Sequence, residues 1–204
     1  MKKLGFLVAL SSLVVGSNLW AYGTGISTFP LSVDNKLISA ELTGITSRGG
    51  GVGVQTRFTQ KINEQSTVDA GLGLGGGERS ARLFAGYDYE ILPDVEYQPK
   101  TSLKAFIENA KEFGVRRNVL GIAPTFSKGL NVSENEIFPF ISLPFGISLN
   151  NKNNTYATSL SANLGVTGNI PMEGSKILTA SVEGIIGVKD SFSGAFVSFG
   201  YPIE

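Results

Sequence analysis

The feature that most constrains this chain is a two-residue alternation of apolar with polar or small side chains, starting near Leu37 and continuing to the C-terminus. Such alternation predicts β-strands whose two faces differ. Strands in soluble sheets usually have about five or six residues, whereas a tilted membrane strand needs about 9–11. The expected strands are longer than the soluble norm and cover 37–47, 50–61, 66–76, 79–91, 100–113, 116–129, 136–149, 155–169, 175–188 and 192–203.

The connections between these segments are short and carry turn-forming residues, as in Arg48-Gly49-Gly50 and Pro171-Met172-Glu173-Gly174. Gly, Asn, Asp and Pro tolerate or preset turn dihedrals, so short connections predict hairpins between sequential strands. Closing such a meander removes its exposed edges. The sequence therefore predicts an all-β, up-and-down antiparallel barrel of about ten strands, within a range of eight to twelve. Thr101 to Phe113 also fits a helix and is the weakest of the expected strands.

The N-terminus has the three parts of a secretory signal peptide. Lys2 and Lys3 precede an apolar stretch from Leu4 to Val15, and Ala21 offers a small residue for cleavage. The apolar stretch is shorter than the roughly 20 residues that a spanning helix needs. We therefore expect a signal peptide at 1–21, a lead-in segment at 22–36 and a barrel domain at 37–204. Within the lead-in, Thr28 to Val33 fits either a short edge strand or an irregular segment, because Pro30 lacks a backbone donor.

Alternation alone does not distinguish a soluble barrel from a membrane barrel, in which the apolar face points outward. Three features favour the membrane barrel. The polar face is rich in Gly and Ser, charged residues make up only 17% of the chain, and aromatic residues occur near strand ends, as in interfacial girdles. These aromatic residues are Tyr87, Tyr89, Phe113, Phe126, Phe145, Tyr156, Phe192 and Tyr201.

The last expected strand supports the same interpretation. Its alternate positions are Ser193, Ala195, Val197, Phe199, Tyr201 and Ile203. This pattern resembles the C-terminal strand of small Gram-negative outer-membrane β-barrels, although the chain ends in Glu204 and lacks a terminal Phe. The resemblance implies a bacterial outer-membrane location, contact with outer-membrane lipid, and recognition by the outer-membrane assembly machinery during biogenesis.

Charged residues of both signs fall on the expected lumen face. They predict either an interior ion-pair network or a charged constriction that selects small solutes. We favour the network, because about ten strands leave little space beyond side chains. The candidate network residues are Arg57, Asp69, Arg82, Asp88, Lys104, Glu108, Glu112, Arg117 and Glu183.

Catalysis is not expected. The chain has no His and no Cys, so the commonest general base, metal ligand and thiolate nucleophile are missing. Glu108 and Glu112 share one strand face and could in principle do acid–base work, but a lumen network places carboxylates in the same way. The Gly-rich runs at 49–53 and 71–77 lack the helix and the Gly-Lys-Ser/Thr of a phosphate loop. No catalytic, cofactor or metal residues are therefore assigned, and the zero net charge gives no indication of nucleic-acid binding.

Two functions follow from these features. The first is an outer-membrane β-barrel with a structural or narrow porin-like role and a mixed-charge lumen. The alternative is a secreted or periplasmic soluble barrel, like a lipocalin, whose apolar face would line a pocket for an apolar ligand.

Overall fold

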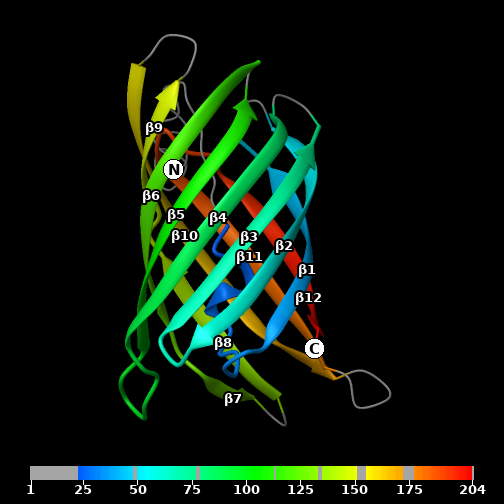
Figure 1. Ribbon diagram of the computed structural model, residues 1–204, viewed down its shortest axis with the longest axis vertical. Helices are drawn as coiled ribbons and strands as arrows, with labels where there is room; N and C mark the ends of the chain where they lie inside the picture. Colours follow the sequence, from blue (N-terminus) through cyan, green and yellow to red (C-terminus); the bar gives the residue numbers. More distant parts are fainter. Residues whose placement is uncertain are drawn as a thin grey trace, which may run out of the picture.

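The computed structural model describes residues 23–47, 50–76, 79–112, 114–132, 135–150, 155–171 and 177–203, and the expected signal peptide at 1–21 lies outside them. The described residues form one closed antiparallel β-barrel (Figure 1). Its strands are β1 Lys36–Ile45, β2 Gly51–Asn63, β3 Ser66–Gly75, β4 Arg79–Leu92, β5 Lys100–Glu112, β6 Val115–Ser127, β7 Leu130–Val132, β8 Asn135–Ser142, β9 Phe145–Asn150, β10 Thr155–Pro171, β11 Ile177–Lys189 and β12 Gly194–Ile203.

The strands pair antiparallel with their sequence neighbours, and β12 pairs with β1 to close the barrel, from Lys36 opposite Ile203 to Ile45 opposite Gly194. β8 and β9 together occupy one position in the wall, between β6 and β10. Within the described residues the wall thus has ten strand positions, and the short β7 pairs with β8 alone. The predicted fold class, an up-and-down barrel of about ten strands, is confirmed.

The wall position of β8 and β9 differs from the single strand predicted at 136–149. The strand is interrupted at Leu143 and Pro144, between β8 and β9. Pro144 has no backbone N–H to donate to a neighbouring strand. The chain nevertheless keeps its alternation through the break. Phe140, Ser142 and Pro144 are buried, whereas Leu143 and Phe145 are exposed. The backbone N–H of Leu143 donates to the carbonyl of Pro124, which keeps the two halves in one wall.

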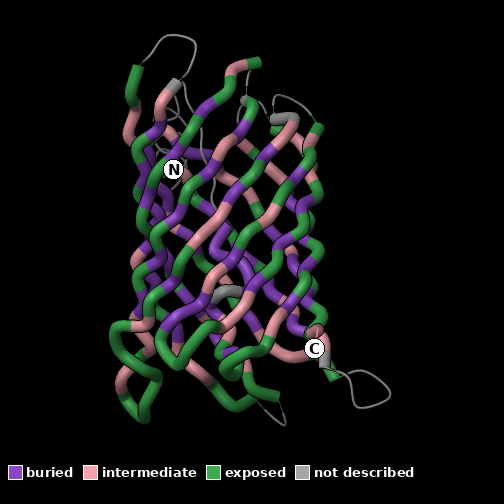
Figure 2. Tube along the Cα trace, in the orientation of Figure 1, coloured by how far each residue is buried: buried purple, intermediate pink, exposed green. Residues whose placement is uncertain are grey.

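Burial alternates along the strands, with polar side chains inside and apolar side chains outside. In β1, Ser39 and Glu41 are buried, whereas Ile38 and Leu42 are exposed. Figure 2 shows the same alternation around the wall. A soluble barrel would place its apolar face inward, so this arrangement does not support the lipocalin-like alternative. It is the arrangement of a transmembrane barrel, whose lipid-facing band is apolar and whose interior is polar.

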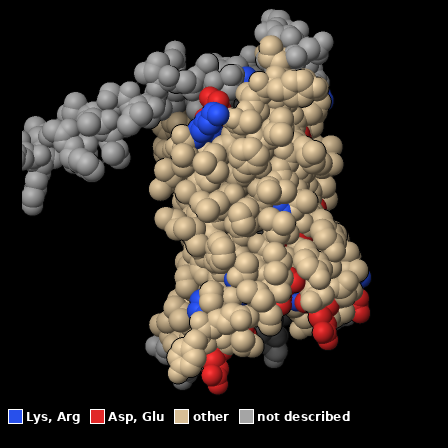
Figure 3. Space-filling view, turned by 90° about the vertical axis from the view of Figure 1, so that its left-hand side faces the viewer, with Lys and Arg blue, Asp and Glu red and all other residues tan. Residues whose placement is uncertain are grey.

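On the face of the barrel that Figure 3 shows, most of the charge lies near the two ends. Figure 3 shows acidic and basic side chains gathered mainly near the two ends of the barrel, with uncharged residues covering most of the wall between them. Several of the predicted girdle residues face outward, including Tyr87, Tyr89 and Tyr156. Phe192 does not, because its side chain is buried with Ile185 and Phe196 inside the barrel. Phe113 lies outside the described residues.

The segment before β1 enters the barrel instead of adding a strand. It contains a short 3-10 helix, η1 (Gly25–Thr28), and the side chain of Ile26 is fully buried. Ile26, Leu31 and Leu37 form a small apolar cluster, and Phe29 packs against it. Among the described residues, no helix is long and apolar enough to cross a membrane.

Candidate functional site in the barrel lumen

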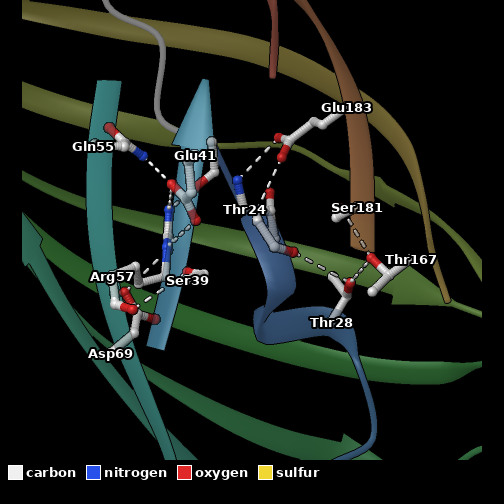
Figure 4. Close-up of polar contacts among 12 residues, drawn as sticks. Thr24, Thr28, Ser39, Glu41, Gln55, Arg57, Asp69, Thr167, Ser181 and Glu183 are labelled. Atoms are coloured by element: carbon white, nitrogen blue, oxygen red, sulfur yellow. Dashed lines mark hydrogen bonds and ion pairs between the residues drawn. The ribbon is translucent and has the colours of Figure 1, made fainter. Parts of the chain in front are cut away.

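Arg57 of β2 lies at the centre of a buried ion-pair network. Its Nε lies 2.8 Å from Oε1 of Glu41 in β1, and its Nη1 lies 3.1 Å from Oδ1 of Asp69 in β3. All three side chains are fully buried. Arg57 stands opposite Ser39 and Gly71 in the register, so both of its partners are diagonal neighbours on the adjacent strands. Figure 4 shows how these side chains converge from the wall.

Asp69 extends the network to β5, where it forms an ion pair with Lys104. The two residues lie on either side of β4. This reach is possible because the residue of β4 opposite Asp69 is Gly86, which has no side chain to obstruct the contact. Asp88 of β4 is buried and stands directly opposite Lys104 in the register. Lys104 therefore lies among carboxylates from two strands.

A second group forms around Arg82 of β4. Its Nε and Nη2 lie 2.7 and 2.9 Å from the two carboxylate oxygens of Glu108 in β5, and its Nη1 donates to Oε1 of Gln55 at 2.9 Å. Gln55 also donates to Glu41, which joins this group to the Arg57 network. The ring of Phe84 lies between the two groups, 4.7 Å from Arg57 Cζ and 4.8 Å from Arg82 Cζ. These distances place both guanidinium groups within cation–π range of one ring.

The N-terminal segment binds to Glu183 of β11 on the opposite wall. The backbone N–H groups of Thr24 and Gly25 donate to the two oxygens of Glu183, both at 2.9 Å, and Asn163 of β10 donates to it at 2.6 Å. Gly25 has φ +61°, and a Cβ atom there would lie 3.0 Å from Glu41 Oε1. Only glycine fits both the left-handed backbone and this close approach without strain.

Two further contacts hold the segment in the lumen. The carbonyl of Gly23 accepts a hydrogen bond from Arg57 Nη2 at 3.0 Å. The hydroxyls of Thr28 and Thr167 lie 3.1 Å apart, and Thr167 donates to Ser181 at 3.0 Å. The segment is therefore linked to both β2 and β10, as Figure 4 shows. We call residues 23–31 the lumenal segment below.

Seven of the nine predicted network residues take part in the contacts described above. Six of them lie in the two adjoining groups, and the seventh contacts the lumenal segment. Arg57, Asp69, Lys104 and Asp88 form the first group, Arg82 and Glu108 the second, and Glu183 holds the segment. Arg117 is buried on the lumen face of β6, opposite Ala110 and Asn150. Glu112 ends β5, and its side chain lies outside what the structure describes.

Sequence reasoning missed Glu41, Gln55, Asn163 and the lumenal segment. Glu41 and Gln55 occupy the alternate positions of β1 and β2 that face the lumen. A search of the lumen-facing positions that included β1 and uncharged polar residues would therefore have found them. The lumenal segment has no periodicity that identifies it. Its one signal is the pair of small residues, Gly23 and Gly25, before the barrel domain.

The site fixes charges rather than presenting a reactive group. The carboxylates of Glu41, Asp69 and Glu108 face cations, and that of Glu183 faces amide N–H groups. Such pairing compensates for much of the desolvation cost of buried charge. Within the described ranges, no group of three or more acidic side chains is arranged to hold a metal ion.

The comparisons with known proteins give structural similarity only. No protein-family model matches the chain, and no curated protein matches its sequence. A solved structure described as "De novo design of transmembrane beta-barrels" aligns with a TM-score of 0.43 and 12% identity, covering 86% of this chain and 100% of that chain. The translocator domain of autotransporter NalP from Neisseria meningitidis aligns with a TM-score of 0.37 and 14% identity, covering 86% and 90%. The chain itself has the fold of a membrane β-barrel, because its wall is apolar outside and polar inside.

Proposed function

We propose that this protein is a Gram-negative outer-membrane β-barrel with a structural role, whose lumen is closed by its own N-terminal segment. The observation that carries the proposal is the position of the lumenal segment, which is joined by hydrogen bonds to Glu183, Arg57 and Thr167. Beside it, the Arg57 and Arg82 groups occupy the lumen with paired side chains. A solute would have to displace the segment to pass.

The proposed location is supported by the sequence. The first 21 residues have the charge, apolar stretch and small residue of a cleaved signal peptide, and the last strand resembles the one that the assembly machinery recognises. Outer-membrane lipid is then the proposed environment of the apolar outer wall. We propose no enzymatic activity, because the chain lacks His and Cys and the described lumen carboxylates have partners.

A narrow porin-like role is the second candidate. It is favoured by the polar lining of the lumen, where Ser, Thr and paired charges are buried along most strands. It requires the lumenal segment to leave its position, because the segment crosses between β2 and β11 (Figure 4). The segment is held by hydrogen bonds and a small apolar cluster, so displacement is physically possible.

Single-channel recording distinguishes the two roles. We expect the purified full-length protein to give no stable conductance in a planar bilayer, and Glu183→Ala to give brief openings because it removes the acceptor for Thr24 and Gly25. A steady ohmic conductance of the unmodified protein would overturn the structural role in favour of the porin-like one. Membrane location is tested separately by fractionation and heat-modifiable gel migration, for which recovery in the soluble periplasm is the contradicting result.

A further inference from the structure

The outer wall carries a pair of basic side chains at an unusual position. Lys111 of β5 and Arg116 of β6 are exposed and occupy outward-facing positions of their strands. They stand directly opposite each other in the register. Like charges directly opposite each other across two strands are destabilising. Among the described residues, the ion pairs do not include either side chain. Within the part of the chain that the structure describes, the pair therefore presents two adjacent positive charges beside the turn between β5 and β6.

A polar pair lies directly next to this basic pair on the same outer face. Asn109 and Asn118 are the adjacent outward residues of β5 and β6, and Asn109 Nδ2 donates to Asn118 Oδ1 at 2.6 Å. Arg116 Nη1 donates to Asn109 Oδ1 at 3.1 Å. This hydrogen bond fixes one edge of the guanidinium group against the wall, and no second partner for the group is found among the described residues. Polar side chains in a lipid-facing position are costly unless they find such partners.

An apolar groove continues from the polar pair toward the middle of the barrel. It has a volume of about 640 Å³, and its lining includes Asn109 and Asn118 together with Leu83, Ala85, Ile107 and Leu120. The small side chains of Ala70 and Ala85 stand directly opposite each other on β3 and β4 and line the groove beside the larger Ile107. The groove and the basic pair thus form one continuous surface, cationic at one end and apolar along its length.

We propose that this surface binds one membrane lipid whose phosphate head group carries a net negative charge. The phosphate would accept charge-assisted hydrogen bonds from Lys111 and Arg116, and an acyl chain would lie in the groove. An anion would convert the opposed like charges into a bridged pair, which explains why both are placed at one register position. A basic residue that only extends toward the membrane interface needs neither an opposed partner nor an adjoining groove. The proposal requires lipid contact with the wall and is independent of whether the lumen conducts.

Native mass spectrometry of the full-length protein tests the site. The protein is released from nanodiscs of phosphatidylcholine that contain a minor fraction of phosphatidylglycerol, and the share of protein ions that retain one phosphatidylglycerol is measured. For the Lys111→Gln/Arg116→Gln variant we expect retention to fall about tenfold, because hydrogen bonds to a charged group are lost. The matched control, Lys36→Gln/Lys189→Gln, removes the same charge from strand ends where the residue directly opposite is not basic. It should retain the lipid as the unmodified protein does.

A second variant separates the head-group site from the groove. Ala85→Trp fills the groove from the lipid-facing wall and leaves Lys111 and Arg116 in place. We expect it to lower phosphatidylglycerol retention while the barrel still shows heat-modifiable migration, which reports folding. Equal retention in the unmodified protein and the Lys111/Arg116 variant would overturn the proposal, as would retention of phosphatidylcholine at the level of phosphatidylglycerol. Retention that falls only in the Lys111/Arg116 variant would overturn the acyl-chain part.

Discussion

The ring of Phe106 lies directly over Gly121, its cross-strand partner on the lumen face of β5 and β6. A Cβ atom added at Gly121 would come 2.3 Å from Phe106 Cζ and 2.6 Å from the carbonyl oxygen of Phe145. The same relationship recurs between Phe84 and Gly71 and between Phe140 and Gly165, again as directly opposed residues. Three lumenal Phe rings thus cover three glycines, which lets large rings fit inside a narrow barrel.

Gly121→Ala should therefore destabilise the barrel by about 1–3 kcal/mol, because a methyl group in this position forces the ring or the β9 backbone to move. Gly184→Ala is the matched control. It lies on the outer wall, where the nearest atom to an added Cβ would be the Leu164 carbonyl oxygen at 3.8 Å, and it should change stability by no more than about 0.5 kcal/mol. The measurement is the urea midpoint of unfolding in lipid vesicles at unchanged slope. Equal midpoints for the two variants would show that the ring and the glycine are not tightly packed.

Replacement of Arg57 by Met should be among the most destabilising single changes. It leaves the fully buried carboxylates of Glu41 and Asp69 without their shared cation, and breaking a buried pair in this way costs about 3–5 kcal/mol. Adding Glu41→Gln should recover part of the loss, because it removes the carboxylate whose described ion pair was with Arg57, whereas Asp69 keeps Lys104. Lys100→Met is the control, since its contact with Glu90 is long, at 3.5 Å, and partly exposed. A double-mutant cycle in urea would show additive effects of Arg57 and Glu41 if the pair were unimportant.

Much of the barrel could be predicted because the alternation of apolar and polar residues shows which face of each strand a residue occupies. Each alternating segment assigns its residues to two faces, and a one-residue slip would exchange those faces, so register within a wall is strongly specified. Arg57, Asp69, Arg82 and Glu183 were placed on the lumen face for this reason, and the structure finds them buried there. Which charge contacts which could not be predicted. The ion pair between Asp69 and Lys104 passes over β4 at Gly86, and this depends on the curvature of the closed wall.

The lumenal segment could not be predicted because its conformation is imposed by partners far away in sequence. Thr24 and Gly25 bind Glu183, more than 150 residues later, and η1 is too short to have a helical pattern. The break between β8 and β9 was missed for a different reason. The side-chain alternation continues across Leu143 and Pro144, so a pattern of faces detects no interruption even though the ladder loses a donor.

The contact between Asp94 and Lys128 should make stability at one end of the barrel depend on pH. Oδ1 of Asp94 accepts a hydrogen bond from Lys128 Nζ, and Oδ2 accepts one from the backbone N–H of Gly129 at 2.6 Å. Partial burial alone would raise the pKa of Asp94, but these hydrogen bonds outweigh it and hold the pKa below its ordinary value of 3.8. Because the folded-state pKa is the lower one, the contact adds stability above about pH 4 and loses it as the pH falls through the lowered pKa.

Asp94→Asn should thus lower the melting temperature slightly at pH 7, and the difference from the unmodified protein should shrink toward zero in acid. The effect is small because both side chains are about 30% exposed and water screens the pair. Glu64→Gln, in an exposed turn at the same end of the barrel, controls for the loss of one negative charge. A melting-temperature difference for Asp94→Asn that stays constant from pH 7 to pH 3 would contradict the role of the carboxylate.

Loss of the Glu183 carboxylate should release the lumenal segment without opening the wall. Glu183→Ala removes the acceptor of both amide hydrogen bonds, each worth about 1.5–3 kcal/mol when the acceptor is charged. Hydrogen exchange of the Thr24 and Gly25 amides should then accelerate about tenfold or more, since 1.4 kcal/mol is a tenfold change in the opening equilibrium.

Glu183→Gln keeps one acceptor oxygen and should give a smaller acceleration, whereas Glu136→Ala, on an exposed part of β8, should give none. Amides in β2 and β3 should keep their protection in all three variants. If the Thr24 and Gly25 amides exchange no faster in Glu183→Ala, the apolar contacts of Ile26 and Leu31 hold the segment by themselves, and the hydrogen bonds to Glu183 do not determine whether the lumen is closed.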